Sequence, residues 1–158
     1  DDGNLKMAPP LGTKADRAAA RAGVLDGTLT LFATDHAPHT AAKKAGGFLK
    51  AANGIIGLET AAAITWFVMV EVCKMKPLDW AARWVVGPAE LLGEKPRTLA
   101  PGEKADLALV NLAADRIVDP DSFKSRSRNT PFAGLGFAAA PVLTAHEGEV
   151  THGHGILR

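Results

Sequence analysis

The stretch of sequence that decides the fold is TLTLFATDHAPH, residues 28–39. Its first part, residues 28–34, is short, rich in β-branched residues, and apolar at both odd and even positions. Such a pattern predicts a strand buried on both faces, as in a parallel sheet. Asp35, His36 and His39 follow at the C-terminal end of this strand. Because α/β barrels place their chemistry at that end of the strands, these polar residues are the first candidates for a functional site.

Two interpretations of this segment remain open on composition alone. A carboxylate such as Asp35 can ligate zinc or act as a general base, and a nearby imidazole can hydrogen-bond an anionic substrate. Pro38 would stiffen the turn that aims His39. The plainer interpretation is an Asp that caps a loop, with histidines at the surface.

The segments around this strand predict helices. Residues 14–25 carry apolar positions at helical spacing, with Thr13 as N-cap. Residues 37–57 form a long polar loop, a kind of segment that often carries function. Residues 58–74 predict a helix that is apolar nearly all round and therefore buried. A further helix starts at Pro77 and should break at Gly87-Pro88.

The character of the chain changes near Gly93. From there Pro and Gly are frequent, and residues 105–111, 116–118 and 142–150 are short strand candidates. We therefore expect an α/β fold with two parts: residues 1–92, built of strand and helix layers, and residues 93–158, a small β-rich module.

Composition excludes several classes of function. The 158 residues carry a net charge of only +1, and the densest basic cluster, residues 124–128, is interrupted by serines, so we expect no nucleic-acid partner. The longest apolar run, residues 61–70, is too short to span a bilayer, so we expect no membrane association. The single cysteine, Cys73, excludes an internal disulfide and favours a cytoplasmic setting, with a buried structural thiol.

Five motifs resemble those of dihydroorotases, which are zinc enzymes of the amidohydrolase superfamily. They are KMAPPL at 6–11, TDHAPH at 34–39, NGIIGLET at 53–60, PGEKADL at 101–107 and SRSRNTPFAG at 125–134. They cover nearly the whole chain in the family's order. The resemblance implies the C-terminal portion of a (β/α)8 TIM-type barrel, followed by a small β-rich module.

The resemblance also implies a reaction and roles for its residues. The reaction is the reversible, zinc-dependent cyclisation of N-carbamoyl-L-aspartate to dihydroorotate in pyrimidine synthesis. Asp35 would ligate zinc and carry a proton, while His39 would contact the substrate carboxylate. The backbone of Asn53 and Gly54 would line the substrate pocket. His36 would support the loop.

The chain departs from the family's pattern at several points. Most of the zinc ligands of dihydroorotases have no counterpart in these 158 residues, and a pair of histidines at His152 and His154 is expected to be a polar tail rather than a metal site. The family has Asn and Arg where this chain has Ala8 and Gly12, and an aromatic residue where it has Asn53. These changes imply weakened or altered substrate binding.

Three hypotheses follow from this combination. The chain is part of a working dihydroorotase acting on a small-molecule substrate, with most of the metal site outside these residues. Alternatively, it is a non-catalytic dihydroorotase-like subunit that assembles with aspartate transcarbamoylase, or part of another cyclic-amide hydrolase of the hydantoinase or allantoinase type. Because a piece of a barrel exposes strand edges and apolar helix faces, we expect a homo-oligomer or another association.

Overall fold

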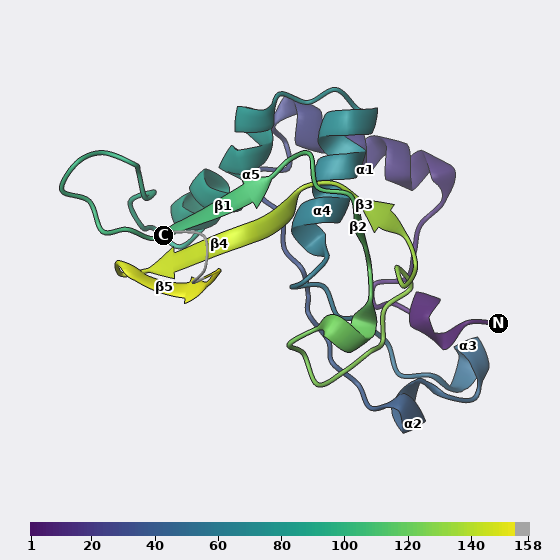
Figure 1. Ribbon diagram of the computed structural model, residues 1–158. Helices are drawn as coiled ribbons and strands as arrows, with labels where there is room; N and C mark the ends of the chain where they lie inside the picture. The colour runs from purple at the N-terminus through teal and green to yellow at the C-terminus, as the bar shows by residue number, and fades with distance from the viewer. Residues whose placement is uncertain (154–158) are drawn as a thin grey trace.

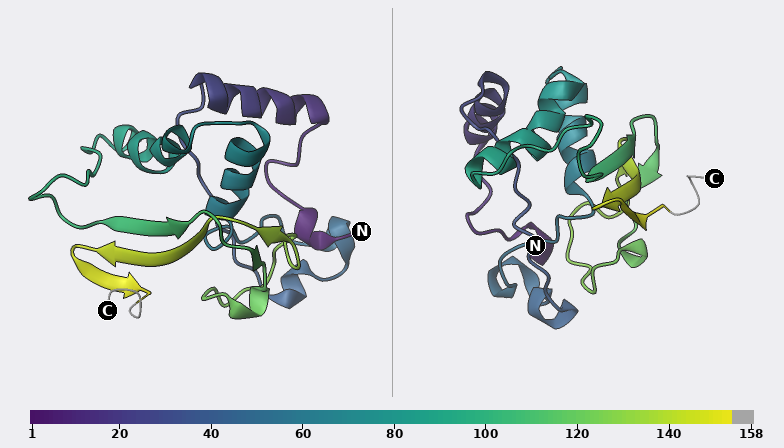
Figure 2. Two further views of the ribbon diagram at one scale, coloured as in Figure 1. Left: turned by 45° about the horizontal axis from the view of Figure 1, so that its top comes forward. Right: turned by 90° about the vertical axis from the view of Figure 1, so that its left-hand side faces the viewer.

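The computed structural model describes residues 1–153, which form a layer of helices packed beside two small antiparallel sheets (Figure 1). The helical elements are η1 (Gly3–Leu5), α1 (Lys14–Asp26), α2 (Ala41–Lys44), α3 (Gly47–Lys50), α4 (Ala61–Thr65), the π-helical η2 (Trp66–Val72), α5 (Pro77–Leu91) and η3 (Pro120–Ser122). The strands are β1 (Leu107–Asn111), β2 (Arg116–Ile117), β3 (Gly136–Phe137), β4 (Ala140–His146) and β5 (Glu149–His152). In the left view of Figure 2, α1, α4 and α5 lie above the long strands, while α2 and α3 lie near the N-terminus.

Helix α1 forms where the sequence predicts it. The Thr13 hydroxyl accepts the Asp16 amide at 3.2 Å, and the Asp16 carboxylate accepts the Thr13 amide at 2.7 Å. This reciprocal capping box satisfies backbone donors that the first turn would otherwise leave free. Gly27 ends the helix with φ of 89°, a left-handed conformation that glycine adopts without a Cβ clash.

The predicted strand over residues 28–34 is wrong for this structure. The segment has no strand assignment, and its side chains are exposed or only half-buried. Its main chain is tied to helices instead, because the Phe32 amide donates to the Arg83 carbonyl at 3.1 Å and the Leu29 amide to that of Gly23 at 2.8 Å. A parallel strand exists only through hydrogen bonds to neighbouring strands, and no described strand lies beside this segment.

The helix predicted over residues 58–74 is confirmed over α4 and η2, but the prediction that it is buried all round is wrong. Only Trp66 and Met69 are buried, whereas Phe67 is 42% exposed and Val72 is 50% exposed. More than half of this helical run, η2, winds as a π-helix, and the Cys73 amide donates to the Val68 carbonyl five residues back. The Cys73 thiol is half-buried against the core. One face of the helix therefore packs and the other does not.

Helix α5 continues through Gly87-Pro88, so the predicted break there is wrong. Pro88 has no backbone amide to donate to the preceding helical turn, but the helix continues to Leu91. Gly87 has a packing role, because a Cβ there would overlap the carbonyl oxygen of Thr30. The glycine thus lets α5 lie directly against the segment that precedes Asp35.

The core lies between the helices and the start of β4. It contains Val24, Trp66, Met69, Met75, Trp80 and Ala139. Trp66 and Trp80 meet edge to face at 5.2 Å, and the indole N–H groups of Trp80 and Trp84 both donate to the Thr65 hydroxyl, at 3.0 and 3.3 Å. All three tryptophans are therefore packing residues of this core.

The strand-rich part consists of a three-stranded antiparallel sheet, in the order β1-β4-β5, and the small β2-β3 pair. The strand predicted over residues 142–150 is instead a hairpin. Glu147 and Gly148 have φ of 49° and 88°, the geometry of a tight turn between two antiparallel strands. Among residues 1–153, no helix is long and apolar enough to cross a membrane.

Candidate functional site

Asp35 lies where the irregular segment 28–34 meets the following loop. Its backbone has φ of 43°, in the left-handed region that Asp tolerates better than most residues, and the residue is exposed. Backbone strain of this kind is often found at functional sites, where the surrounding structure holds it in place. The carboxylate is therefore accessible to a ligand.

His36 supports the loop, as the resemblance to dihydroorotases implied. Its Nδ1 accepts the Gly57 amide at 3.1 Å and the Leu58 amide at 3.3 Å. A ring nitrogen that accepts from two amides is unprotonated, so the proton of the neutral ring is on Nε2. The imidazole thereby joins the TDHAPH segment to the start of the GLET segment.

His39, Asn53 and Gly54 are brought together by the fold. The His39 Nε2 lies 2.8 Å from the carbonyl oxygen of Asn53, and because a carbonyl only accepts, Nε2 carries a proton and donates. This bond fixes the plane of the ring. It leaves Nδ1 as the nitrogen that a ligand could reach.

Gly54 is required by close packing. Its φ is 105°, and a Cβ there would lie 2.5 Å from the Ala37 Cβ. Its amide donates to the Lys6 carbonyl at 2.8 Å, while the Ala37 amide donates to the Ile55 carbonyl at 2.9 Å. The KMAPPL, TDHAPH and NGIIG segments are thus held together by backbone hydrogen bonds.

Asn129 is a buried residue whose role sequence reasoning missed. Its Oδ1 accepts the His39 amide at 3.2 Å, and its Nδ2 donates to the carbonyls of Ala37 at 2.9 Å and Gly54 at 3.3 Å. Its own carbonyl accepts the Ile56 amide at 3.1 Å. One side chain thereby fixes the loop around His39. The only sequence signal was its place within the SRSRNTPFAG motif.

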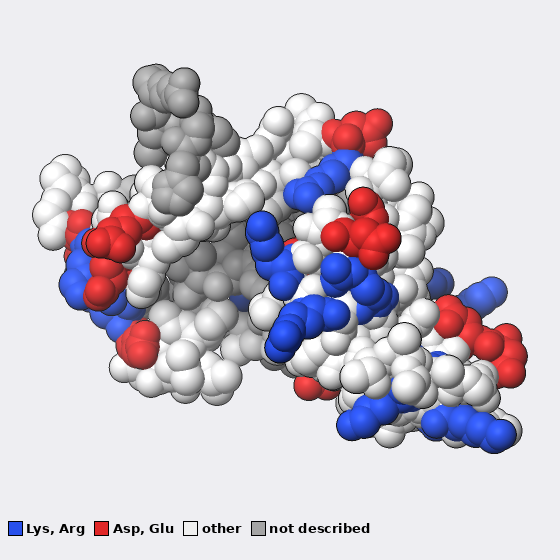
Figure 3. Space-filling view, turned by 60° about the horizontal axis from the view of Figure 1, so that its bottom comes forward, with Lys and Arg blue, Asp and Glu red and all other residues white. Residues whose placement is uncertain are grey.

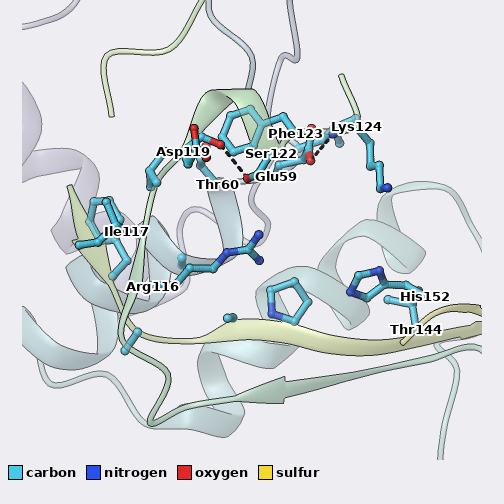
Figure 4. A pocket seen from close by; sticks show the side chains of 17 residues that line it. Glu59, Thr60, Arg116, Ile117, Asp119, Ser122, Phe123, Lys124, Thr144 and His152 are labelled. Atoms are coloured by element: carbon cyan, nitrogen blue, oxygen red, sulfur yellow. Dashed lines mark hydrogen bonds between the residues drawn. The ribbon is translucent and has the colours of Figure 1, made fainter. Parts of the chain in front are cut away.

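Glu59 makes a second connection to that motif. Its carboxylate oxygens accept the backbone amide of Lys124 at 2.8 Å (Figure 4) and that of Ser125 at 2.9 Å. Glu59 borders a pocket of about 260 Å³, which we call the Arg116 pocket because Arg116 extends into it from β2. None of Asp35, His39, Asn53 or Gly54 lines this pocket.

Lys44 is a buried cation beside the loop. It is 9% exposed, and its ammonium donates to the carbonyls of Ala52 at 2.7 Å and Gly54 at 2.9 Å. Burial lowers the pKa of Lys44, a change that nearby Asp2 opposes and Lys6 reinforces. With His39 and Asn129, Lys44 borders a second pocket of about 390 Å³, here named the Lys44 pocket.

The residues present do not fit a zinc site by themselves. Nowhere in residues 1–153 do three His, Cys, Asp or Glu side chains gather as a metal site would need. The His36 Nδ1 and the His39 Nε2 are both occupied by backbone partners. A catalytic zinc takes about three protein ligands, so Asp35 could supply at most one of them. His152 lies beside the Arg116 pocket, and His154, the other half of the predicted polar tail, is outside the described residues.

Ala8 and Gly12, where the chain departs from the dihydroorotase pattern, have different surroundings in the structure. Ala8 is exposed and offers no side-chain donor or acceptor. A Cβ at Gly12 would lie 2.8 Å from that of Asp16, so the capping box of α1 packs directly against this glycine. A larger side chain at this position would displace the start of α1.

Comparison with known proteins identifies relatives. No protein-family model matches the chain. A dihydroorotase of Bacillus caldolyticus is 47% identical over 146 residues, covering 90% of this chain and 34% of the relative. A dihydroorotase of Listeria monocytogenes is 42% identical over 161 residues, covering 100% of this chain and 37% of the relative. The chain therefore spans about a third of the length of the curated relatives it matches.

Solved structures that superpose on this chain include hydantoinases. An L-hydantoinase from Arthrobacter aurescens superposes with a TM-score of 0.85 at 30% identity, covering 93% of this chain and 34% of that one. A D-hydantoinase from Thermus sp. superposes with a TM-score of 0.83 at 19% identity, covering 95% and 34%, and shows the fold alone. The fold is thus a mixed α/β one that matches about a third of a hydantoinase chain, and the strands of residues 1–153 do not close a barrel.

Proposed function

From the relation of this chain to dihydroorotases, whose C-terminal part it matches, we propose that it supplies one part of a dihydroorotase active site. The reaction is the reversible conversion of N-carbamoyl-L-aspartate to dihydroorotate and water. The observation that carries the proposal is the 47% identity to a dihydroorotase across 90% of the chain. Residues 1–92 would belong to a (β/α)8 barrel and residues 93–158 to a β-rich module. The single Cys73 supports a reducing cytoplasm as the setting.

Asp35 would be the acid–base residue of this reaction. In the ring-opening direction, an exposed carboxylate at this position would take a proton from the attacking water and deliver it to the departing ring nitrogen. The left-handed backbone at Asp35 supports a functional role. Asp35 would also be one ligand of the zinc that the resemblance implies, with the other ligands outside this chain.

His39 would bind the substrate through its free nitrogen. The Asn53 carbonyl holds the Nε2 proton, so a substrate carboxylate would meet Nδ1. A carboxylate only accepts, and His39 would therefore bind it as an imidazolium with protons on both nitrogens. The Asn53 and Gly54 backbone would form the adjoining wall, held in place by Asn129 and Lys44.

Two other functions each have an observation in their favour. The Arthrobacter aurescens L-hydantoinase, at 30% identity, favours a related cyclic-amide hydrolase. Ala8 and Gly12 favour a non-catalytic subunit that associates with aspartate transcarbamoylase, since Ala8 lacks the side chain to bond a polar substrate. The identity of 42–47% to dihydroorotases outweighs both.

A chimaera tests the proposal. This chain would replace the matching third of the Bacillus caldolyticus dihydroorotase, and turnover of dihydroorotate, hydantoin and allantoin would be measured. We expect dihydroorotate to be the preferred substrate. Preference for hydantoin or allantoin would support the related hydrolase, and a folded, inactive chimaera that regains activity on Ala8→Asn would support the non-catalytic subunit.

A further inference from the structure

The Arg116 pocket lies where three parts of the chain meet. Residues 58–63, which lead into α4, form one wall, and β2, η3 and Lys124 form another. The third wall consists of β4 and of His152 at the end of β5. Figure 3 shows a hollow on the face that carries η3 and the 123–129 segment, with Lys and Arg side chains gathered beside it. A ligand in the pocket would therefore touch the helical part and both sheets at once.

The walls of the pocket are mostly apolar. Leu58 and Ile117 line it, and because they are 67% and 58% exposed, both leave apolar surface in solvent. Phe123 and Phe137 also line it, and each is half-buried. Removing apolar surface from water is favourable by about 25 cal/mol per Å². The volume of about 260 Å³ lies below that of pockets for drug-sized ligands, so a fitting apolar group is a single ring or a short chain.

Arg116 supplies a positive charge within these apolar walls. Its side chain extends from β2 into the pocket (Figure 4), and the pairing of β2 with β3 fixes its backbone opposite Phe137. Among residues 1–153, no carboxylate lies within 4.0 Å of its guanidinium nitrogens. The planar guanidinium carries five N–H donors whose geometry matches a carboxylate. A ligand carboxylate would therefore find an unpaired cation here.

The two carboxylates that line the pocket are held by backbone amides. Both oxygens of Glu59 accept amides of the 123–129 segment. The Asp119 Oδ1 accepts the Asp121 amide at 3.0 Å. These two groups leave the Arg116 guanidinium available, but their negative charges repel a ligand that carries more than one negative charge. The pocket therefore favours a ligand with a single carboxylate.

We propose that the Arg116 pocket binds a small monocarboxylic acid with an apolar body, such as an aromatic acid. Its carboxylate would accept two N–H bonds from the Arg116 guanidinium, in the planar two-point contact that arginine makes with carboxylates. Its apolar body would lie against Leu58 and Ile117. This binding goes beyond the proposed function and does not depend on it.

The test is a calorimetric titration of the full 158-residue chain at low ionic strength with benzoate and three probes that each change one feature. Benzamide keeps the ring without the charge, acetate keeps the charge without the ring, and phthalate adds a second negative charge. We expect each of the three to bind about tenfold more weakly than benzoate, a difference of about 1.4 kcal/mol. Benzoate that does not bind, or any of the three binding as tightly as benzoate, would overturn the proposed ligand class.

Arginine variants locate the bound benzoate. Arg116→Gln removes the charge but keeps a polar side chain on β2, and it should weaken benzoate binding about tenfold. Arg126→Gln, in the Lys44 pocket, and Arg17→Gln, beside an apolar pocket next to α1, are matched losses of exposed arginines. Both should leave benzoate binding unchanged. Circular dichroism would verify that the variants fold.

Ile117→Glu gives a second test that keeps Arg116. Because Ile117 is 58% exposed, a charged side chain can be accommodated there, and its carboxylate would pair with Arg116 and repel benzoate. We expect benzoate binding to weaken about tenfold, and this variant decides the matter alone if Arg116→Gln does not fold. Benzoate binding that either folded variant leaves unchanged, or that is lost in the Arg126 or Arg17 variant, would overturn the assignment to this pocket.

Discussion

At the scale of single residues, Gly54 and Asn129 each fix the backbone around His39. Gly54 allows the NGIIG segment to pass directly over Ala37. Asn129 donates to the carbonyls of Ala37 and Gly54, and so bonds the backbone on both sides of the loop. Neither residue carries chemistry of its own. Their substitution should therefore disturb the geometry of the site without removing a reacting group.

We expect Gly54→Ala to destabilise the chain more than Gly102→Ala. Both glycines have positive φ, of 105° and 90°, so both alanines meet the left-handed penalty of about 1–2 kcal/mol. Only the Gly54 substitution also meets a neighbour, Ala37, whereas the space at Gly102 is open. The overlap should add about 1–3 kcal/mol. Urea unfolding of the two variants measures the difference, and equal losses would contradict the packing at Gly54.

Asn129→Asp should release the loop around His39. The substitution keeps the acceptor of the His39 amide but replaces the donors to the Ala37 and Gly54 carbonyls with a carboxylate oxygen. A cost of about 1–3 kcal/mol follows from leaving buried polar groups unpaired. Hydrogen exchange of the amides of residues 37–56 should accelerate. Asn111→Asp, at the exposed end of β1, is the control. Unchanged exchange in the Asn129 variant would show that Asn129 does not hold the loop.

The sequence allowed only part of this site to be predicted. The resemblance to dihydroorotases implied that His36 supports the loop, and the structure confirms this with two hydrogen bonds from backbone amides. The roles of Asn129 and Lys44 could not be predicted, because their partners lie up to 92 residues away in sequence and are backbone carbonyls. Every residue has a backbone carbonyl, so residue types do not show which carbonyls will accept a hydrogen bond. Asp35, His39, Asn53 and Gly54 remain predictions as functional residues.

At the scale of elements, the sequence predicted the structure that local signals determine. It did not predict the structure that depends on pairing between distant segments. The Thr13 cap and the helical spacing that follows it are local, and α1 forms as expected. The 28–34 segment depends on partner strands, which the described residues do not provide, and it forms no ladder. Helix α5 does not break at Gly87-Pro88, because the packing of Gly87 against Thr30 outweighs the hydrogen bond that Pro88 cannot donate. The hairpin turn at Glu147 and Gly148 was missed because only the glycine signals positive φ in sequence.

The β1-β4-β5 sheet contains a pH-sensitive contact at Asp106. Its carboxylate accepts the Glu147 amide at 2.7 Å, lies 3.0 Å from the His146 Nδ1 and pairs with Arg97 at 3.3 Å. The Glu147 amide is the main cause that lowers the pKa of Asp106, burial opposes it, and His146 and Arg97 add to the lowering. A lowered pKa stabilises the fold above the unfolded-state value, about 3.9, and the gain is lost as pH falls through the folded-state value.

The Asp106→Asn variant should therefore be less stable than the unmodified chain at pH 7. The difference between their free energies of unfolding should shrink as the pH falls below about 4. Asn cannot ionise, so it lacks the stabilisation that the carboxylate provides at neutral pH. Urea unfolding at pH 7 and pH 3 measures the gap. Asp115→Asn, exposed outside the sheet, serves as the control. A gap of the same size at both pH values would mean that the charge of Asp106 does not stabilise the sheet.

At the scale of the whole molecule, the described residues expose much apolar surface beside the 28–34 segment, whose backbone pairs with no described strand. Leu29 is 44% exposed within the 28–34 segment, and it borders an apolar pocket of about 320 Å³ with Phe32, Ile64 and Val68. Unpaired extended backbone and apolar patches promote association. The fold matches about a third of a hydantoinase chain, in which further elements would be available to cover these faces.

We expect the 158-residue chain to associate in solution rather than sediment as a single monomer. Leu29→Lys should weaken association, because it places a charge on the apolar face, and Leu99→Lys, in an exposed loop, should not. Analytical ultracentrifugation across a concentration series measures the effect. A single monomeric species with cooperative thermal unfolding would show that these faces need no partner.

We propose that Asp35 acts in the active site of a dihydroorotase. The most direct test of this proposal is the rate of dihydroorotate hydrolysis by the chimaera that carries this chain, compared with the same chimaera bearing Asp35→Asn and with an Asp115→Asn control. Removing a general acid–base group should lower the rate by about 10²–10⁴-fold, while the control keeps its rate. An Asp35→Asn chimaera that hydrolyses dihydroorotate as fast as the unmodified one would contradict the account.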